Sequence, residues 1–161
     1  MPAFWLMCII ALVVSAIGFY KYVYFISLGY GFSMAAIGVA MLIRFRDGLS
    51  AGPAIMCALL VVYGCRLGGY LLAREVRSAS YRGAMKREIK DGKGMKLIAR
   101  LSIWFSCALL YACEASPVLF RLQNGRGTDA LCVLGLVVMA AGIALESAAD
   151  LQKSAAKRKY M

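Results

Sequence analysis

The sequence contains no histidine, and this absence removes several classes of functional site at once. Without an imidazole there is no histidine general base, no histidine-containing triad and none of the zinc sites that use a histidine ligand, which are most of them. The nucleotide fingerprints GxGxxG and GxxxxGK[ST], the CxxC pair, the HExxH helix and the nucleophile elbow are missing as well. We therefore expect no metal centre, and none of the kinds of site that these motifs form.

Acidic residues are also scarce, with eight Asp and Glu against nineteen Lys and Arg, and none precedes Asp47. The resulting net charge of +11 can indicate nucleic-acid binding in a soluble protein. Here the basic residues are clustered between apolar runs, as they are in membrane proteins that follow the positive-inside rule. We therefore expect this charge to contact anionic lipid, and we predict no nucleic-acid partner.

Cysteine is present, but not in a pattern typical of metal or redox sites. All six cysteines lie in apolar runs, and we interpret them as buried structural thiols. They are Cys8, Cys57, Cys65, Cys107, Cys113 and Cys132.

Hydrophobic residues are in excess, making up 62% of the chain against about 45–50% in soluble domains. We predict a single membrane domain, 1–161, of the all-α class: a polytopic bundle of about five transmembrane helices. The first span lacks a preceding basic residue and a cleavage site, so we interpret it as retained. A basic loop is expected at 74–96 and a helical tail at 150–161. The predicted spans cover about residues 3–20, 24–43, 50–73, 97–120 and 130–149.

The distribution of basic residues predicts the orientation of this bundle. With the N-terminus outside, the inner segments hold fourteen Lys and Arg residues and the outer segments hold four. Because inner segments of membrane proteins are enriched in these residues, we expect the C-terminus to lie in the cytoplasm. The remaining basic residue, Arg66, lies inside the third span.

A polar stripe marks the end of the fifth span. Glu146, Asp150, Lys153 and Lys157 follow one another at spacings of four, three and four residues, which places them on one face of a helix. An acid at the membrane edge is costly and usually functional. We therefore expect the fifth helix to leave the bilayer still helical and to carry this stripe into the cytoplasm.

Further polar and small residues lie within the spans. Arg66 and Glu146 both lie on the cytoplasmic half of the bundle, and we hypothesise an ion pair between them. Glu114 in the fourth span is interpreted as a structural acid or an interface residue. Gly64 and Gly68 form a GxxxG pattern, which predicts close packing against another helix.

Two segments resemble the steroid 5-alpha-reductase superfamily, and more closely its bacterial membrane branch of uncharacterised reductases. The aromatic patch at 18–33 has the same character. The two patterns are Tyr63-x-x-Arg66-x-x-x-Tyr70 followed by Arg74, and Gly142-x-x-x-Glu146-x-x-x-Asp150 followed by Lys157. The resemblance implies an all-helical protein of a bacterial inner membrane that binds NADPH at the cytoplasmic side. Its implied reaction is the reduction of a carbon–carbon double bond next to a carbonyl, in a steroid or another lipid.

The resemblance also implies roles for individual residues. Tyr63 would be the catalytic residue that contacts the substrate carbonyl. Glu146 and Asp150 would bind the cofactor, and Lys157 would face its additional phosphate. Structural or substrate-side roles would fall to Arg66, Tyr70 and Arg74. The family's glutamate partner for the tyrosine, on an earlier span, has no counterpart here.

Members of the family resembled have about seven spans. The resemblance covers nearly all of this chain but only the first two-thirds of the family's length. On this interpretation the chain is an N-terminal portion that needs further spans or a partner to complete the cofactor pocket. The alternative is a non-enzymatic membrane protein whose GxxxG pattern and polar stripe mediate assembly. A membrane methyltransferase of the isoprenylcysteine type also remains open, because that family is related. Transport is a third class, which only Arg66 and Glu146 favour.

Overall fold

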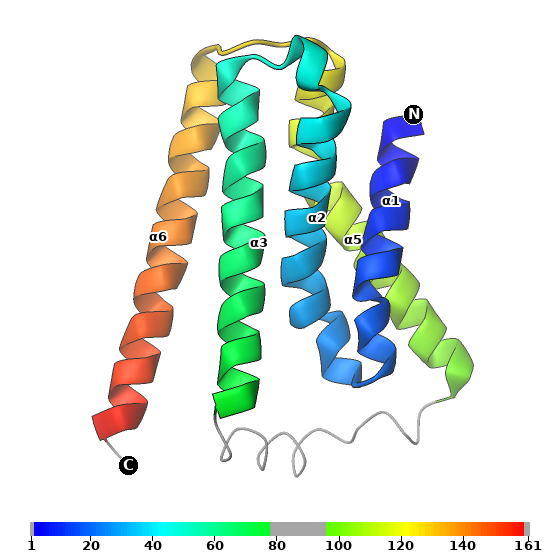
Figure 1. The fold of residues 1–161 in the computed structure, drawn as a ribbon, viewed down its shortest axis with the longest axis vertical. Coiled ribbons are helices and arrows are strands. Elements are labelled where there is room, and N and C mark those ends of the chain that lie inside the picture. Colours follow the sequence, from blue (N-terminus) through cyan, green and yellow to red (C-terminus); the bar gives the residue numbers. More distant parts are fainter. Residues whose placement is uncertain (1, 78–95, 160–161) are drawn as a thin grey trace.

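The computed structural model describes residues 2–77 and 96–159, and every regular element in those ranges is a helix. Successive helices run antiparallel, and the chain enters at one end of the bundle and reaches the other with its last helix (Figure 1). Short 3-10 turns form both connections between the first three long helices. The elements are α1 (Pro2–Ser15), η1 (Ala16–Phe19), η2 (Tyr22–Phe25), α2 (Leu28–Arg44), η3 (Arg46–Gly48), α3 (Ala51–Arg77), α5 (Leu97–Gln123) and α6 (Ala130–Lys159).

Four of the described helical segments are long and apolar enough to cross a bilayer, and the first apolar helix, Ala3–Phe19, is shorter. The prediction of an all-α polytopic membrane bundle is therefore confirmed. α6 continues without a break through Lys159, so the expected helical tail is confirmed over the part that the structure describes. The predicted loop at 74–96 is partly wrong, because α3 remains helical to Arg77. Residues 78–95 of that loop lie outside the described residues.

The tightest contact in the bundle lies between α2 and α3. A Cβ added to Gly64 would lie 2.4 Å from the carbonyl oxygen of Gly31 and 2.5 Å from the backbone nitrogen of Ala35. A Cβ on Gly31 would lie 2.7 Å from the backbone nitrogen of Gly68. Only glycine lets two helix backbones approach this closely, so the packing role predicted for the GxxxG pattern is confirmed.

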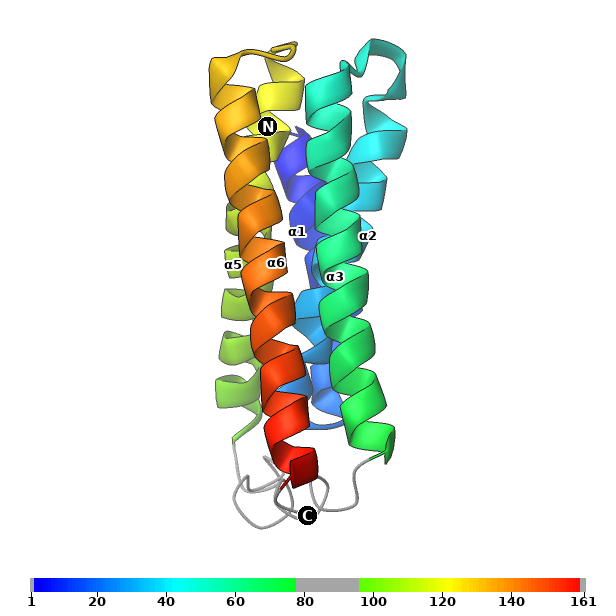
Figure 2. The same ribbon diagram turned by 90° about the vertical axis from the view of Figure 1, so that its left-hand side faces the viewer.

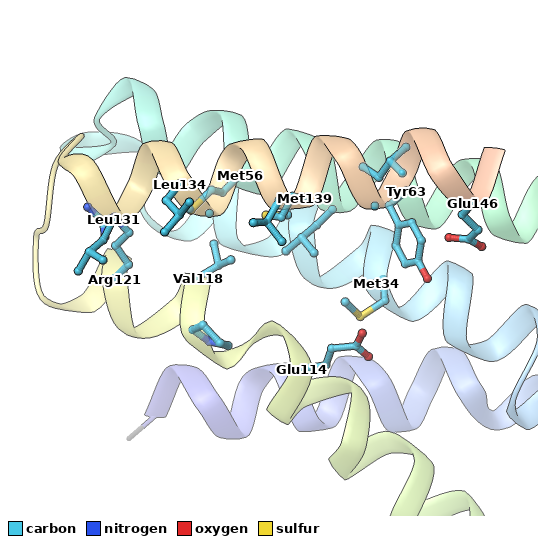
Figure 3. Close-up of a pocket in the computed structure, with 16 residues that line it drawn as sticks. Met34, Met56, Tyr63, Glu114, Val118, Arg121, Leu131, Leu134, Met139 and Glu146 are labelled. Atoms are coloured by element: carbon cyan, nitrogen blue, oxygen red, sulfur yellow. The ribbon is translucent and has the colours of Figure 1, made fainter. Parts of the chain in front are cut away.

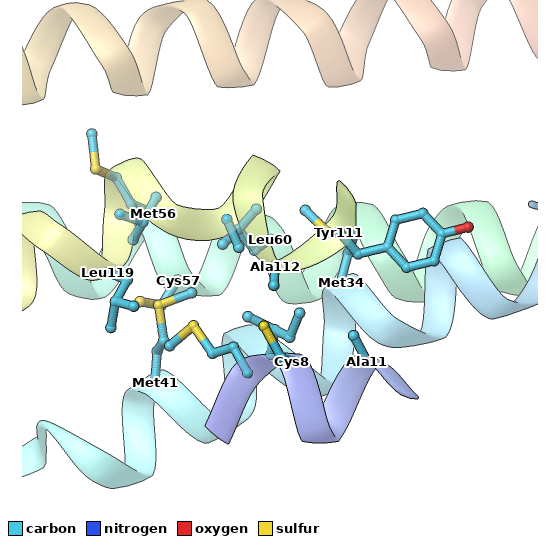
Figure 4. Close-up of a cluster of buried hydrophobic side chains, with 14 of the residues drawn as sticks. Cys8, Ala11, Met34, Met41, Met56, Cys57, Leu60, Tyr111, Ala112 and Leu119 are labelled. Carbon is cyan, nitrogen blue, oxygen red and sulfur yellow. The ribbon is translucent and has the colours of Figure 1, made fainter. Parts of the chain in front are cut away.

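The buried core is shared by α1, α2, α3 and α5, with Cys132 added from the start of α6, and it is rich in small and sulfur-containing side chains (Figure 4). The fully buried side chains include Met34, Met41 and Cys57. The interpretation of all six cysteines as buried is wrong for Cys65 and Cys113, which are exposed on the outer surface of the bundle. A lipid-facing surface is itself apolar, so a thiol on such a span needs no burial in protein.

The corner between α1 and α2 is held by donors from α5. Irregular backbone at the edge of a membrane must find hydrogen-bond partners, because lipid supplies none. The donors are Arg100 to Phe19 O at 2.7 Å, Trp104 to Leu12 O at 3.0 Å and Tyr111 to Phe25 O at 2.6 Å. These bonds fix α5 against α1 and α2.

α6 contacts this core mainly near its start, where Cys132 is buried and Leu136 packs against the cluster. It packs along α3 and makes little contact with the other helices, and most of its side chains are exposed (Figure 2). α5 and α6 are joined by a short connection that contains Gly125, whose φ of +60° suits the tight turn predicted there. Because α5 is tied to α1 and α2 while α6 follows α3, space remains between α5 and α6.

Candidate functional site

A cavity of about 750 Å³ occupies the space between α6 and the helices α2, α3 and α5. Its walls are mainly apolar, with Met56, Val118 and Met139 among the side chains that point into it (Figure 3). The polar groups of the wall are gathered toward the two ends. Arg121 lies at the end near the connection between α5 and α6, and the opposite end carries Tyr63, Glu114 and Glu146 (Figure 3). The cavity therefore suits a mainly apolar molecule that has a polar group at one end.

A chain of three hydrogen-bonded side chains lies at the second end of the cavity. The Tyr63 hydroxyl donates to the Tyr30 hydroxyl at 3.2 Å, and Tyr30 donates to Glu114 Oε1 at 2.8 Å. The rings of Tyr30 and Tyr63 meet edge to face, with centroids 6.0 Å apart. We call Tyr63, Tyr30 and Glu114 the hydroxyl chain. It links three different helices, α3, α2 and α5.

The glycine contact between α2 and α3 explains why the two phenols meet. Tyr30 directly precedes Gly31, and Tyr63 directly precedes Gly64, the two residues whose backbones touch. Without Cβ atoms at that point, the helices are close enough for neighbouring side chains to bond across the seam. The glycines therefore position the hydroxyl chain.

Glu114 lies beside an interruption in the helical hydrogen bonding of α5. Pro117 has no N–H and cannot donate to the carbonyl of Cys113. The Ser116 hydroxyl donates to that carbonyl instead, at 2.7 Å. A proline is tolerated inside a membrane helix when a side chain satisfies the freed group in this way.

A second polar group joins α3 to α6, one helical turn beyond Tyr63. Arg66 Nη2 lies 2.5 Å from Asp150 Oδ2, and Arg66 Nη1 lies 3.5 Å from Glu146 Oε2. The Tyr70 and Ser154 hydroxyls are 3.2 Å apart. Four-residue spacing on both helices produces this arrangement, which we call the α3–α6 ladder.

The predicted ion pair between Arg66 and Glu146 is confirmed, and Asp150 is the closer partner of the same guanidinium. One arginine thus balances two acids of the predicted stripe. The Arg74 guanidinium lies 5.8 Å from the centre of the Tyr70 ring. The structure therefore brings six of the seven predicted site residues to one end of the bundle: Tyr63, Arg66, Tyr70, Arg74, Glu146 and Asp150.

The other members of the stripe are described less completely. Lys153 is exposed on α6. Lys157 lies within the helical part of α6, but its side chain is outside the described residues. The role implied for it by resemblance therefore stays a prediction.

Tyr30 and Ser154 were not predicted as site residues, and Glu114 was predicted only as a structural acid or an interface residue. Tyr30 lies within the aromatic patch, where nothing distinguishes it from its neighbours except the glycine that follows. Ser154 continues the four-residue spacing of Glu146 and Asp150, a signal that was available. Glu114 had the general signal of an acid within a span, but its partner depends on which residue of α2 it meets.

The other end of the cavity, at Arg121, lies beside the α5–α6 connection, which is held by polar contacts. Arg121 is ion-paired with Asp129 and donates to Gly127 O at 2.6 Å. The Cys132 N–H donates to Asp129 Oδ1 at 2.8 Å, so Asp129 caps the first turn of α6. The hydrogen bond from Cys132, together with Arg121, lowers the pKa of Asp129 from its ordinary value.

The described residues, 2–77 and 96–159, contain no group of three or more Cys, Asp or Glu side chains placed to hold a metal ion. Two acids are placed to accept hydrogen bonds from a polar ligand. The side chains of Glu146 and Asp150 remain 36% and 25% exposed despite their pairing with Arg66. A polar cofactor that binds against this part of α6 would contact the carboxylates of Glu146 and Asp150.

Comparison with known proteins gives one match. Residues 6–161 match the family described as "Protein of unknown function (DUF1295)". No curated protein and no solved structure matches the chain.

Proposed function

This chain belongs to the DUF1295 family, and we propose that it is part of a membrane reductase that uses NADPH. The proposed substrate is a lipid or steroid in which a carbon–carbon double bond is conjugated to a carbonyl. The motif resemblance to the steroid 5-alpha-reductase superfamily supports this proposal. A second support is that three of the matched residues, Tyr63, Gly142 and Glu146, line one cavity.

The position of Tyr63 is the observation that carries the proposal. Its phenol lies at the polar end of an apolar cavity that lies within a bundle of membrane length. A volume of about 750 Å³ falls within the range of about 300–1,000 Å³ found for small-molecule sites. A lipid could lay its apolar body along Leu134 and Val138 of α6, with its carbonyl at Tyr63. A hydrogen bond from a phenol polarises a carbonyl and makes the conjugated carbon more electrophilic.

The residues of the α3–α6 ladder fit an NADPH molecule that approaches from the same end. Bound NADPH would supply the hydride. Glu146 and Asp150 would accept hydrogen bonds from its hydroxyl and amide groups. Arg66 offsets their charge, which would otherwise repel the phosphates. Lys157 is proposed to face the 2′-phosphate, because it follows Asp150 on α6 by about two turns.

We propose that this end of the bundle faces the cytoplasm of a bacterial cell, where NADPH is found. The connection between η1 and η2, which contains Lys21, lies there with the last turn of α3, the first turn of α5 and the end of α6 (Figure 1). Among the described residues, the opposite end carries four basic residues at or next to the two short connections: Arg44, Arg46, Arg121 and Arg126.

The first test is nucleotide binding by the purified protein in lipid nanodiscs. NADPH fluorescence is expected to report binding at least about tenfold tighter than that of NADH, because the 2′-phosphate adds a charge-assisted contact. Lys157→Ala should remove this preference, and Lys153→Ala is the matched control on the same helix. If no nucleotide binds, the reductase proposal fails and the non-enzymatic assembly protein becomes the better interpretation.

The second test is reduction of a 4-en-3-one steroid with deuterium-labelled NADPH, followed by mass spectrometry. Transfer of deuterium to the product is expected, and Tyr63→Phe should slow it by about 10²-fold or more. A side chain added at Gly142 should also slow the reaction, because Gly142 lines the cavity and a Cβ there meets nothing within 4 Å, so the new side chain can occupy the cavity. Gly142→Leu is therefore expected to block turnover. Gly69→Leu, at an equally open position outside the cavity lining, should not.

A further inference from the structure

The hydroxyl chain has a direction. Tyr63 donates its proton to Tyr30, and Tyr30 donates its proton to Glu114, whose oxygen accepts. A phenol has a single proton, so Tyr63 in this arrangement presents only lone pairs to the cavity. In this direction Tyr63 can accept a hydrogen bond from a ligand hydroxyl but cannot donate one to a carbonyl.

Protonation of Glu114 permits the opposite direction. A protonated carboxyl can donate to Tyr30, which leaves the Tyr30 proton free to point at the oxygen of Tyr63. The Tyr63 proton is then free to point into the cavity. Each tyrosine reverses by rotating its hydroxyl hydrogen about the C–O bond. The oxygen–oxygen distances, 3.2 Å from Tyr63 to Tyr30 and 2.8 Å from Tyr30 to Glu114, can stay the same.

We propose that Glu114, acting through Tyr30, sets whether Tyr63 offers the cavity a hydrogen-bond donor or an acceptor. With Glu114 protonated the site selects a carbonyl ligand, and with Glu114 ionised it selects the corresponding alcohol. Glu114 and Tyr30 are positioning residues in this scheme, and Tyr63 is the group that touches the ligand. The inference rests on the proposed function for its substrate class, and it adds the residue that determines the recognised head group.

The scheme also balances the proton that a conjugated reduction consumes. The carbonyl oxygen takes the proton of Tyr63, Tyr63 takes that of Tyr30, and Tyr30 takes that of Glu114. One O–H bond breaks and one forms at each of the two tyrosines, and Glu114 ends as a carboxylate. The enol that results, once hydride has reached the far carbon, donates to Tyr63, and the chain then runs in the direction seen in the structure.

Other titratable groups near Glu114 are engaged elsewhere or lack a hydrogen-bonded path to Tyr63. On α6, Glu146 is paired with Arg66 of α3. On α5 itself, Tyr111 donates to the backbone of the α1–α2 corner. From α1, which has no charged residue, the thiol of Cys8 lies near that of Cys113. Among the described residues, Glu114 is the carboxyl that bonds into the chain ending at Tyr63.

A binding experiment without cofactor tests the proposal. Cholest-4-en-3-one and cholest-4-en-3-ol share one skeleton and differ only in an acceptor or donor head group. Their affinities for the protein in nanodiscs would be measured from pH 3.5 to pH 8, a range that includes the ordinary pKa of a glutamate side chain, about 4.3. The ratio of ketone to alcohol affinity is expected to rise on the order of tenfold as the pH falls, since one hydrogen bond contributes about 0.5–1.5 kcal/mol. The enone absorption band should move to longer wavelength at low pH, as its carbonyl gains a donor.

Two variants assign this pH dependence to the hydroxyl chain. Tyr30→Phe interrupts the chain and Glu114→Gln removes its titration, so each should give an affinity ratio independent of pH. Tyr111→Phe removes a neighbouring phenol whose ring lies 5.1 Å from that of Tyr30 but which is outside the chain, and it should retain the wild-type profile. Intact tryptophan fluorescence would establish that each variant is folded.

The proposal is overturned if the wild-type ratio does not change with pH, if the change persists in Tyr30→Phe, or if neither probe binds. None of these outcomes involves a nucleotide. Absence of NADPH binding would overturn the proposed reductase while leaving a pH-dependent ligand site in place, so the two failures can be told apart.

Discussion

Helix α3 forms two very different seams with its neighbours. Toward α2 its glycines bring backbone against backbone, and the side chains there are buried. Toward α6 it reaches across with long polar side chains, and a cavity opens beside them. The two interfaces of α3 therefore have different roles. The interface with α2 fixes the position of Tyr63, and the interface with α6 leaves room for a ligand to reach Tyr63.

The largest effect is expected from Gly64→Leu, which would force the α2 seam apart. Even the first carbon of the new side chain would meet backbone atoms of α2 at 2.4 and 2.5 Å, and backbone cannot move aside as a flexible side chain can. We expect a loss of about 3 kcal/mol or more in the free energy of unfolding. Unfolding in detergent, followed by the fluorescence of Trp5 and Trp104, would measure it.

Gly69→Leu is the matched control for that variant, because a Cβ at Gly69 meets nothing within 4 Å. It lies five residues further along the same helix. A stability near that of the wild type is expected. Equal losses in the two variants would mean that the close backbone contact does not stabilise the bundle.

A smaller effect is expected from breaking the α3–α6 ladder. Arg66→Gln leaves Glu146 and Asp150 close together without their cation, and Asp150→Asn leaves Arg66 with its more distant partner alone. We expect each to cost about 1–3 kcal/mol, because the Arg66 side chain is only 22% exposed. In the double variant the total should fall short of the sum of the single losses. Strictly additive losses, measured in the same unfolding assay, would argue against the pairing.

The smallest effect is expected at Asp129, which caps α6 at the far end of the cavity. Its pKa is lower in the folded protein than in the unfolded chain, so its charge stabilises the fold above its ordinary pKa of 3.8 and ceases to do so as the pH falls below that value. Asp129→Asn keeps a capping oxygen but removes the charge. The difference in melting temperature between Asp129→Asn and wild type should therefore be present at pH 7 and shrink below about pH 4.

This prediction would be contradicted if the difference in melting temperature between Asp129→Asn and wild type stayed the same at acid pH. That outcome would assign the effect to hydrogen bonding alone. Arg121, which also bonds to the carbonyl of Gly127, would then hold the connection without help from the acid's charge.

Much of the architecture could be predicted from the sequence because its signals are local. Hydrophobic runs of membrane length predicted the helices, and the spacing of Glu146 and Asp150 predicted that they share one helix face; the structure shows both paired with Arg66 of α3. The pairing of Arg66 with Glu146 was predicted because an unpaired charge inside a membrane has a high free-energy cost and needs a partner at the same depth. The burial of Cys65 and Cys113 was wrong for a related reason: apolar sequence in a membrane protein does not distinguish a core position from a lipid-facing one.

What the amino-acid order determined by itself was the set of helices, their polar faces and the glycines that allow close approach. The hydroxyl chain was decided only by the tertiary structure. Its bonds join residues 33 and 84 positions apart, and they exist because one glycine contact sets the register of α2 on α3 and one set of donors sets the position of α5. A change of one turn in either register would move these hydroxyls by about 5 Å and leave each of them without the others.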